Sequence, residues 1–464
     1  FLNDGKAHFT LAPPSDLSAK SWVTPGGSLL DYDHDGILDF WPSTVARWPY
    51  GGVPNQYPTL YRGNGDGTFT NVSAEVGLPG GAGKVGDDTS PRPFFGSTAC
   101  DLDGDSDDDL VLATYGRLEN WVFRNDDGHF VEVGRELGIA HDDREDYRDD
   151  QSYLCWCADP ANAAGADCQP PPPKPGLACT SFGGPYFRGW GPAQEKSYNL
   201  GGNNFSFACN DIDDDGDMDL MSATIVHGDV GGASDPSELI LNPGDGTKFL
   251  RPGNLVTGLE RPEKGLLWNH GDDLPVFVDV DLDGKKDVFL TTTGAYPNSH
   301  AWVWRQKEGT TFEEIGVAAG FSAKINYHGP SFVDFDGDGD LDLVVGDTNT
   351  LAVHAFRNVV GQDQNWLRVR LAGKGAGFSN RDGIGAKVTV TAGGVAHVQQ
   401  LQGGFGHGNV ENDLVLTFGL GAACDVEKIE VRWPRATGAT TYSDVRANYT
   451  VVLGEGETRA RYLP

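Results

Sequence analysis

The sequence predicts an all-β protein, a β-propeller followed by a small C-terminal β-sandwich or barrel-like domain. Glycine and proline are abundant, with 64 Gly and 27 Pro in 464 residues against 2 Met, and short apolar runs are separated by turn residues. An aspartate-rich loop recurs five times between apolar strands, and a hairpin phrase recurs about every 60 residues. A fixed period of this kind is typical of blade arrays, so we expect the repeats to form the propeller.

Each aspartate loop has the pattern D-x-D-x-D-x-x-x-D and lies between two apolar strands. Carboxylates at the first, third and fifth positions of a tight loop point toward one centre, where a backbone carbonyl and the ninth-position Asp complete an all-oxygen site that suits Ca²⁺. We therefore expect about five calcium sites, one per loop. The aspartates that would ligate them are Asp31, Asp33, Asp35, Asp39, Asp101, Asp103, Asp105, Asp109, Asp211, Asp213, Asp215, Asp219, Asp279, Asp281, Asp283, Asp287, Asp334, Asp336, Asp338 and Asp342.

The sixth position of the loop is glycine in four of the five copies, where a sharp turn favours a residue free to take positive φ. Ser106 takes this position in the second copy. An EF-hand is excluded because it needs Glu at the twelfth position and helices on both sides, whereas these loops have strands as flanks. A solvated acidic turn is the alternative for any single loop, but five copies with identical spacing argue against it.

The number of blades follows from the hairpin phrase, which begins near residues 2, 62, 124, 241, 305 and 357. The interval from 124 to 241 is about twice the others, so a degenerate blade in this gap would give seven blades. Six blades with a disulfide-bonded insertion at residues 141–200 is the alternative. We expect the N-terminal hairpin to close the ring by joining the last segment in one blade.

Seven cysteines include a cluster of four, Cys155, Cys157, Cys168 and Cys179, beside a proline run. Their spacing matches no common zinc pattern, which favours disulfides, with free thiols as the main alternative. An odd total leaves at least one thiol unpaired, and Cys424 is a candidate. Disulfides would place the protein outside a reducing cytosol, so we expect a secreted, extracellular or periplasmic location.

The formal net charge of −32 argues against nucleic acid as a partner, because phosphates would be repelled. No run of about 18 apolar residues occurs, so we expect no insertion into a membrane. We expect a monomer whose ligand is a protein, a glycan or a small molecule.

The loops and hairpins of residues 1–361 resemble the FG-GAP or VCBS repeats of integrin α-subunit propellers and of the cartilage acidic protein family. In that family the inter-strand loops bind Ca²⁺ on one face of the propeller. The resemblance thus implies that the twenty aspartates are calcium ligands here.

Residues 362–464 resemble the ASPIC and UnbV domain that follows such repeats in that family. The matching segments are NWLRVRL from Asn365, the turn around Gly383 and Gly385, LTFGLG from Leu416 and IEVRWP from Ile429. One departure is that the stretch GGFGHGNVEND and Thr417 replace a Ser-Gln pair and a His that such domains usually carry. Alternation in LRVRL, AKVTVTA and KIEVRW favours half-buried strands of a sandwich or barrel.

The sequence favours two functions, an extracellular binding module and an enzyme. The first is a calcium-stabilised extracellular propeller that binds or adheres to a ligand, by analogy with adhesion receptors. The second is an enzyme, a lyase, cyclase or hydrolase acting on a small molecule, since UnbV-type proteins are named from gene clusters for natural-product assembly. Its site would lie at the channel mouth opposite the aspartate loops or at the domain junction, with His227, His270 and His328 as candidate catalytic residues. A purely structural surface protein is the third alternative.

Overall fold

The protein is all-β in the part of the chain that its computed structural model describes. This part is residues 2–463 except 4, 19–22, 46–56, 82–90, 145, 150, 173–178, 182–183, 186–190, 195–200, 226–234, 261–271, 293–299, 322–326, 349, 409 and 435. Within it the α-helices are α1 (Gln151–Ala158) and α2 (Asn254–Thr257). Neither has the length and apolar character needed to span a bilayer.

Five antiparallel sheets form the propeller blades of the described chain, and each has one aspartate loop between its first two strands. Blades one and two consist of β3 (Val23–Leu30), β4 (Asp39–Val45), β5 (Tyr61–Gly63), β6 (Phe69–Asn71), β7 (Phe94–Cys100), β8 (Asp109–Thr114), β9 (Trp121–Asp126) and β10 (His129–Glu132). Blades three to five consist of β13 (Asn204–Asn210), β14 (Asp219–Thr224), β15 (Leu239–Ile240), β16 (Asp272–Val278), β17 (Asp287–Thr292), β18 (Trp302–Gln306), β19 (Phe312–Glu314), β20 (Tyr327–Val333), β21 (Asp342–Asp347) and β22 (Ala352–Phe356).

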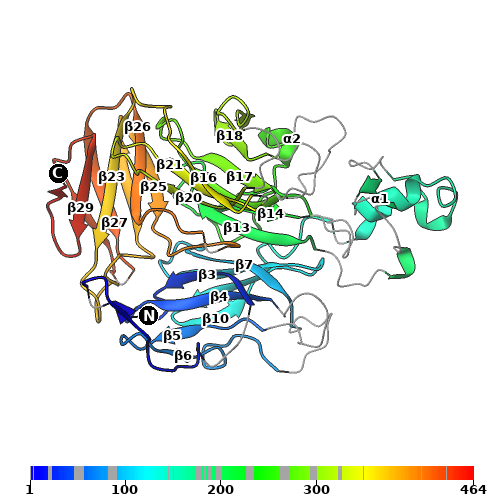
Figure 1. Ribbon diagram of the computed structural model, residues 1–464, viewed down its shortest axis with the longest axis horizontal. Helices are drawn as coiled ribbons and strands as arrows, with labels where there is room; N and C mark the ends of the chain where they lie inside the picture. The colour runs from blue at the N-terminus through cyan, green and yellow to red at the C-terminus, as the bar shows by residue number, and fades with distance from the viewer. Residues whose placement is uncertain are drawn as a thin grey trace.

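Neighbouring blades bury the apolar strands on both faces. The second strands β8, β14 and β17 are buried at every residue, which explains why apolar residues such as Leu110–Ala113 of β8 and Val288–Leu290 of β17 follow one another without alternating. The first strands β3, β7, β13, β16 and β20 pack side by side in chain order. A disulfide between Cys100 and Cys209 joins the ends of β7 and β13. The blades therefore follow one another in an arc around a common centre (Figure 1).

The segment 141–200 does not form a blade in its described residues. It contains α1, the 3-10 turns at Tyr147–Asp149, Ala166–Cys168 and Pro192–Gln194, and the short pair β11 (Thr180–Ser181) and β12 (Gly184–Pro185). Disulfides join Cys155 to Cys179 and Cys157 to Cys168, which confirms the prediction for this cluster, and Cys424 is free and exposed as predicted. Figure 1 shows α1 at the opposite end of the molecule from the C-terminal strands. With five sheets in the described chain, neither seven nor six blades is confirmed.

The C-terminal part forms two four-stranded sheets that share one apolar core, as expected for a small β-sandwich. The first sheet has the order β26 (Val415–Gly421), β23 (Asn365–Ala372), β29 (Tyr449–Gly454) and β30 (Arg461–Tyr462). The second has the order β25 (Val395–Gln400), β24 (Lys387–Ala392), β27 (Val426–Arg432) and β28 (Ala439–Tyr442). Val369, Val388, Phe418 and Ile429 are completely buried between them.

Residues 401–414, which we call the inserted loop, leave this sandwich between β25 and β26 and enter the centre of the propeller. The backbone of the loop bonds to β3, where Leu29 N donates to Gly403 O (2.7 Å), and to β7, where Gly406 N donates to Ser97 O (2.7 Å). Near its end, Asp413 N donates to the carbonyl of Phe332 on β20 (3.1 Å). The inserted loop thus links the first blade to the last.

Ring closure by the N-terminal hairpin is a wrong prediction. The strands β1 (Leu2–Asn3) and β2 (Phe9–Thr10) pair with each other and with no other described strand. The apolar side chains Phe405 and Val410 of the inserted loop pack into the core of blades three to five instead. Closure therefore depends on a segment from the other end of the chain.

Candidate metal sites

The aspartate loops share one backbone conformation. In all five, the N–H of the sixth residue donates to the carboxylate of the first Asp, as Gly216 N does to Asp211 (2.8 Å) and Gly284 N to Asp279 (2.9 Å). The sixth residue has a positive φ in every copy. Ser106 also adopts it, at φ 86°, so the second loop has the same geometry as the others.

The replacement Ser106→Gly should stabilise the protein by about 1 kcal/mol, because a side chain at this φ is strained and glycine is not. Thermal unfolding measures the change. The reciprocal control is Gly216→Ser at φ 101°, where an added Cβ meets no atom within 4 Å and only the backbone strain changes. A melting temperature lowered by the first change, or unaffected by the second, would contradict the strain argument.

The predicted carboxylates converge. In four loops, three of them have ligand oxygens within 4.8 Å of one another: Asp31 with Asp33 and Asp39, Asp101 with Asp103 and Asp105, Asp211 with Asp213 and Asp215, and Asp279 with Asp281 and Asp287. Burial, together with repulsion from neighbouring carboxylates, raises the pKa of the first Asp to about 7 in three of these loops, at Asp31, Asp211 and Asp279.

These residues fit a hard cation. The Oδ1 atoms of Asp279 and Asp281 are buried and accept no hydrogen bond, so each retains an oxygen that lacks a partner. Buried carboxylate oxygens without partners are costly, and a divalent cation would satisfy them. In the fifth loop two arginines also supply positive charge: Arg368 Nη1 lies 2.9 Å from Asp334 Oδ2, and Arg357 contacts Asp336 and Asp338.

The ninth-position aspartate has a second role that the sequence did not predict. In the third loop Asp219 accepts a hydrogen bond from Ile212 N, at the second position of the loop (3.0 Å), and another from Asn242 N just beyond β15 (2.7 Å). The equivalent pair of bonds occurs at Asp39, Asp109, Asp287 and Asp342. This carboxylate therefore fixes the loop to the third segment of its own blade.

A ladder of side-chain amides then connects each blade to the one before it. The residue whose N–H binds the ninth Asp also donates from its side-chain amide to the second-position carbonyl of the preceding loop. The four bonds are Asn125 to Tyr32 O (3.0 Å), Asn242 to Leu102 O (2.8 Å), Gln306 to Ile212 O (2.8 Å) and Asn358 to Val280 O (2.8 Å). The first blade, which has no predecessor, has Gly63 at this position. In the sequence, the recurrence of Asn or Gln in the hairpin phrase was the pattern that could have indicated these amide bonds between blades.

Replacing Asn242 by Ala should therefore lower the free energy of unfolding by ~1–3 kcal/mol, because the carbonyls of Leu102 and Met218 lose a buried donor. Urea unfolding monitored by tryptophan fluorescence measures it. Asn64→Ala is the control, since that amide is exposed and its side-chain hydrogen bonds, with Thr68 and Thr70, stay within its own hairpin. An equal, small effect of both changes would show that the ladder contributes nothing.

The C-terminal sandwich contacts all five aspartate loops, a feature that the sequence did not reveal. Polar contacts of this kind occur at Gly377 N with Asp35 O (2.7 Å), Lys387 Nζ with Asp101 Oδ2 (3.3 Å), His397 Nδ1 with Asp214 Oδ2 (3.1 Å), Gly421 N with Leu282 O (2.9 Å), and Arg368 with Asp334. Two of these cations contact first-position aspartates that are almost completely buried. The electrostatics of the loops and the docking of the sandwich are thus coupled.

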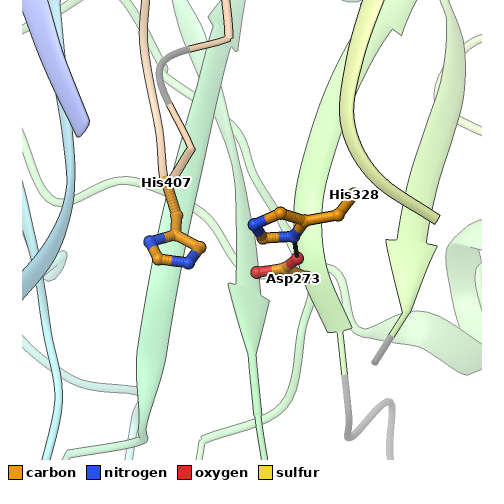
Figure 2. A group of neighbouring side chains, drawn as sticks. All are labelled: Asp273, His328 and His407. Carbon is orange, nitrogen blue, oxygen red and sulfur yellow. Dashed lines mark hydrogen bonds and ion pairs between the residues drawn. The ribbon is translucent and has the colours of Figure 1, made fainter. Parts of the chain in front are cut away.

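A different cluster lies at the other end of the first strands (Figure 2). Asp273 and His328 lie near the starts of β16 and β20, whereas the aspartate loops follow the ends of these strands. The carboxylate of Asp273 contacts His328 Nδ1, and this contact raises the pKa of His328. His407, on the inserted loop, faces His328 with ring centroids 5.1 Å apart, and burial lowers its pKa.

Only one of the three histidines proposed from the sequence lies in the described chain. His227 and His270 are outside the described residues, whereas His328 lies on the predicted rim. Asp273 and His407 were missed. The signal for Asp273 was its place at the start of the first strand of the fourth blade, and His407 belongs to the stretch that departs from the ASPIC and UnbV pattern.

Comparison with known proteins gives two family matches. The model described as FG-GAP-like repeat matches residues 279–345, and the model described as ASPIC and UnbV matches residues 377–460. Cartilage acidic protein 1 of Mus musculus is 32% identical over 167 residues, which are 34% of this chain and 25% of that protein. The protein of the same name from Homo sapiens is also 32% identical over 167 residues, 24% of its length.

This chain covers about a quarter of the length of these curated relatives. Among solved structures, a rhamnogalacturonan lyase of Bacillus licheniformis aligns with a TM-score of 0.27 and 12% identity, covering 95% of this chain and 82% of that one. The recognition from sequence is confirmed by the family matches: the chain carries an FG-GAP-like repeat followed by an ASPIC and UnbV segment, and it is related to cartilage acidic protein 1.

Proposed function

We propose that this protein is a calcium-stabilised extracellular binding module of the adhesion type. The observation that carries the proposal is the convergence of carboxylates, the first of each cluster buried, in loops of one shared geometry. Calcium, held by the aspartates of these loops, would neutralise their mutual repulsion and satisfy oxygens such as Asp279 Oδ1 that lack partners. The twenty aspartates predicted from the sequence are its proposed ligands, with about five ions per chain.

The extracellular location is supported by two observations. Three disulfides are present, and disulfides persist in oxidising compartments outside the cytosol. The related protein, cartilage acidic protein 1, is named after cartilage. We expect a monomer with a protein, glycan or small-molecule ligand, and the net charge of −32 disfavours nucleic acid.

Calorimetric titration of chelator-treated protein with Ca²⁺ tests this function. We expect saturable binding of several equivalents, and loss of one site in Asp281→Asn, which replaces a converging carboxylate of the fourth loop. Asp425→Asn is the control, because this residue lies outside the loops, beside the exposed Cys424. Absence of calcium binding by the unaltered protein would overturn the proposal.

An enzyme is the second candidate, and the contact of His328 with Asp273 and its proximity to His407 favour it. The cluster lies at the end of the first strands opposite the aspartate loops, and His407 comes from the inserted loop; this position supports the channel-mouth and domain-junction locations expected from the sequence. A lyase, cyclase or hydrolase activity on a small molecule would require His328. Activity that survives His227→Ala, His270→Ala and His328→Ala together would contradict this assignment of catalytic residues.

A further inference from the structure

The cluster of Asp273, His328 and His407 has the donor set of a transition-metal site. One oxygen of Asp273 and one nitrogen each of His328 and His407 lie within 4.8 Å of one another. Two imidazoles and one carboxylate suit Zn²⁺ and related first-row divalent ions, whereas Ca²⁺ prefers the all-oxygen environment of the aspartate loops. The three residues lie on separate segments, β16, β20 and the inserted loop. The fold brings them close enough together to coordinate one such ion.

An independent observation is that one carboxylate oxygen of Asp273 has no hydrogen-bond partner. Asp273 is 1% exposed, and its Oδ1 atom accepts no hydrogen bond although Oδ2 contacts His328. A buried carboxylate normally has both oxygens satisfied, because leaving one without a partner costs free energy. A bound cation beside His328 would satisfy this oxygen.

The surroundings of His407 orient it for metal binding. Its Nδ1 atom lies 3.4 Å from the carbonyl oxygen of Phe95, and the rings of Phe95 and Phe205 pack against the imidazole. A ring N–H directed at a carbonyl leaves the other nitrogen, Nε2, as the ligand atom, which is the usual outer-shell arrangement of metal-binding histidines. Aromatic packing also excludes water from this side and strengthens electrostatic attraction to the ion.

One side of the cluster remains open. The side chain of His328 is 33% exposed, so the ion would be reached from solvent. Three protein ligands leave at least one position of a tetrahedral ion for water or for an oxygen of a bound molecule. The site would therefore differ in kind from a closed structural zinc site.

We propose that Asp273, His328 and His407 bind a divalent first-row transition ion, with Zn²⁺ as the best match to the donor set, and that the ion joins the propeller to the inserted loop. This inference is independent of calcium binding, because none of the three residues belongs to an aspartate loop. It also gives the inserted loop a further contact with the last blade, in addition to the hydrogen bonds that Asn412 and Asp413 form with Phe332.

Zinc titration of the full chain without an affinity tag tests the proposal. The measurement is made in excess Ca²⁺ and in a Cys424→Ser background, because an exposed free thiol can bind zinc on its own. We expect one saturable zinc equivalent, visible d–d absorption when Co²⁺ replaces Zn²⁺, and a melting temperature that rises with zinc. In His407→Phe, which preserves the ring packing against Phe95 and Phe205, zinc affinity should fall at least ~10-fold.

The matched control is His354→Ala. His354 also lies near a buried aspartate, Asp347, at 3.7 Å, but on β22, away from the cluster. Zinc binding should be unchanged in this variant, and the calcium-dependent melting of every variant reports whether it is folded. Absence of zinc binding in the parent protein, or equal affinity in His407→Phe and the parent, would overturn the proposal and leave Asp273 and His328 as a structural pair.

Discussion

Removing divalent cations with EDTA will lower the melting temperature of this protein sharply. Each aspartate loop packs several carboxylates into a small volume, and burial and mutual repulsion raise the pKa values of Asp31, Asp211 and Asp279. At a free calcium concentration ~100-fold above Kd, each site adds up to ~2.7 kcal/mol to the free energy of unfolding. Two such sites therefore contribute an amount comparable to the whole stability of many domains, which is about 5–15 kcal/mol.

Differential scanning calorimetry with and without EDTA measures this effect. Back-titration with Ca²⁺ should restore the original melting temperature, whereas Mg²⁺ should restore less, because it demands a stricter octahedral geometry and gives up its water reluctantly. Zinc alone should not restore it, which separates the aspartate loops from the cluster of Asp273, His328 and His407. An unchanged melt in EDTA would refute stabilisation by calcium.

The second large effect is expected at Arg368, which joins the C-terminal sandwich to the fifth loop. Its side chain is 10% exposed. Its Nη1 atom lies 2.9 Å from Asp334 Oδ2, and its Nη2 atom contacts Asp413. The change Arg368→Met leaves the carboxylate of Asp334, which is 1% exposed, without its cation. Breaking a buried pair in this way costs ~3–5 kcal/mol.

Arg370→Met is the matched control, because Arg370 lies two residues along β23 and its side chain is exposed. Thermal unfolding compares the two variants, and limited proteolysis of the inserted loop reports whether the sandwich has loosened from the propeller. Cleavage should be faster in Arg368→Met than in the control. Similar melting temperatures for both variants would show that this ion pair does not hold the sandwich in place.

The repeats could be predicted from the sequence because their signals are local. Each loop, from Asp31–Asp39 to Asp334–Asp342, carries its proposed ligands, its turn residue and its flanking strands within a few neighbouring positions. The strand alternation of residues 365–371 likewise identified the C-terminal sandwich. Such patterns reflect the alternation of side chains between the two faces of a strand. This alternation depends only on the local backbone, so it can be recognised in the sequence.

Long-range contacts could not be predicted in this way. Gly406 contacts Ser97, and Arg368 contacts Asp334, but nothing in the order of the residues indicates which strand the inserted loop meets. The N-terminal hairpin was expected to close the ring because it shares the repeated phrase, yet the closing contacts come from the C-terminal half. Convergence of Asp273, His328 and His407 is likewise a property of three segments that only the fold brings together.

A crystal grown with Ca²⁺ and measured for anomalous scattering tests the central claim most directly, since the ions themselves are located. The account predicts a peak inside the aspartate loops, among the carboxylates of Asp279, Asp281 and Asp287 and their counterparts in the other blades. Loops that keep their shape but contain no peak at saturating calcium would contradict it and reduce the repeated aspartates to a backbone scaffold.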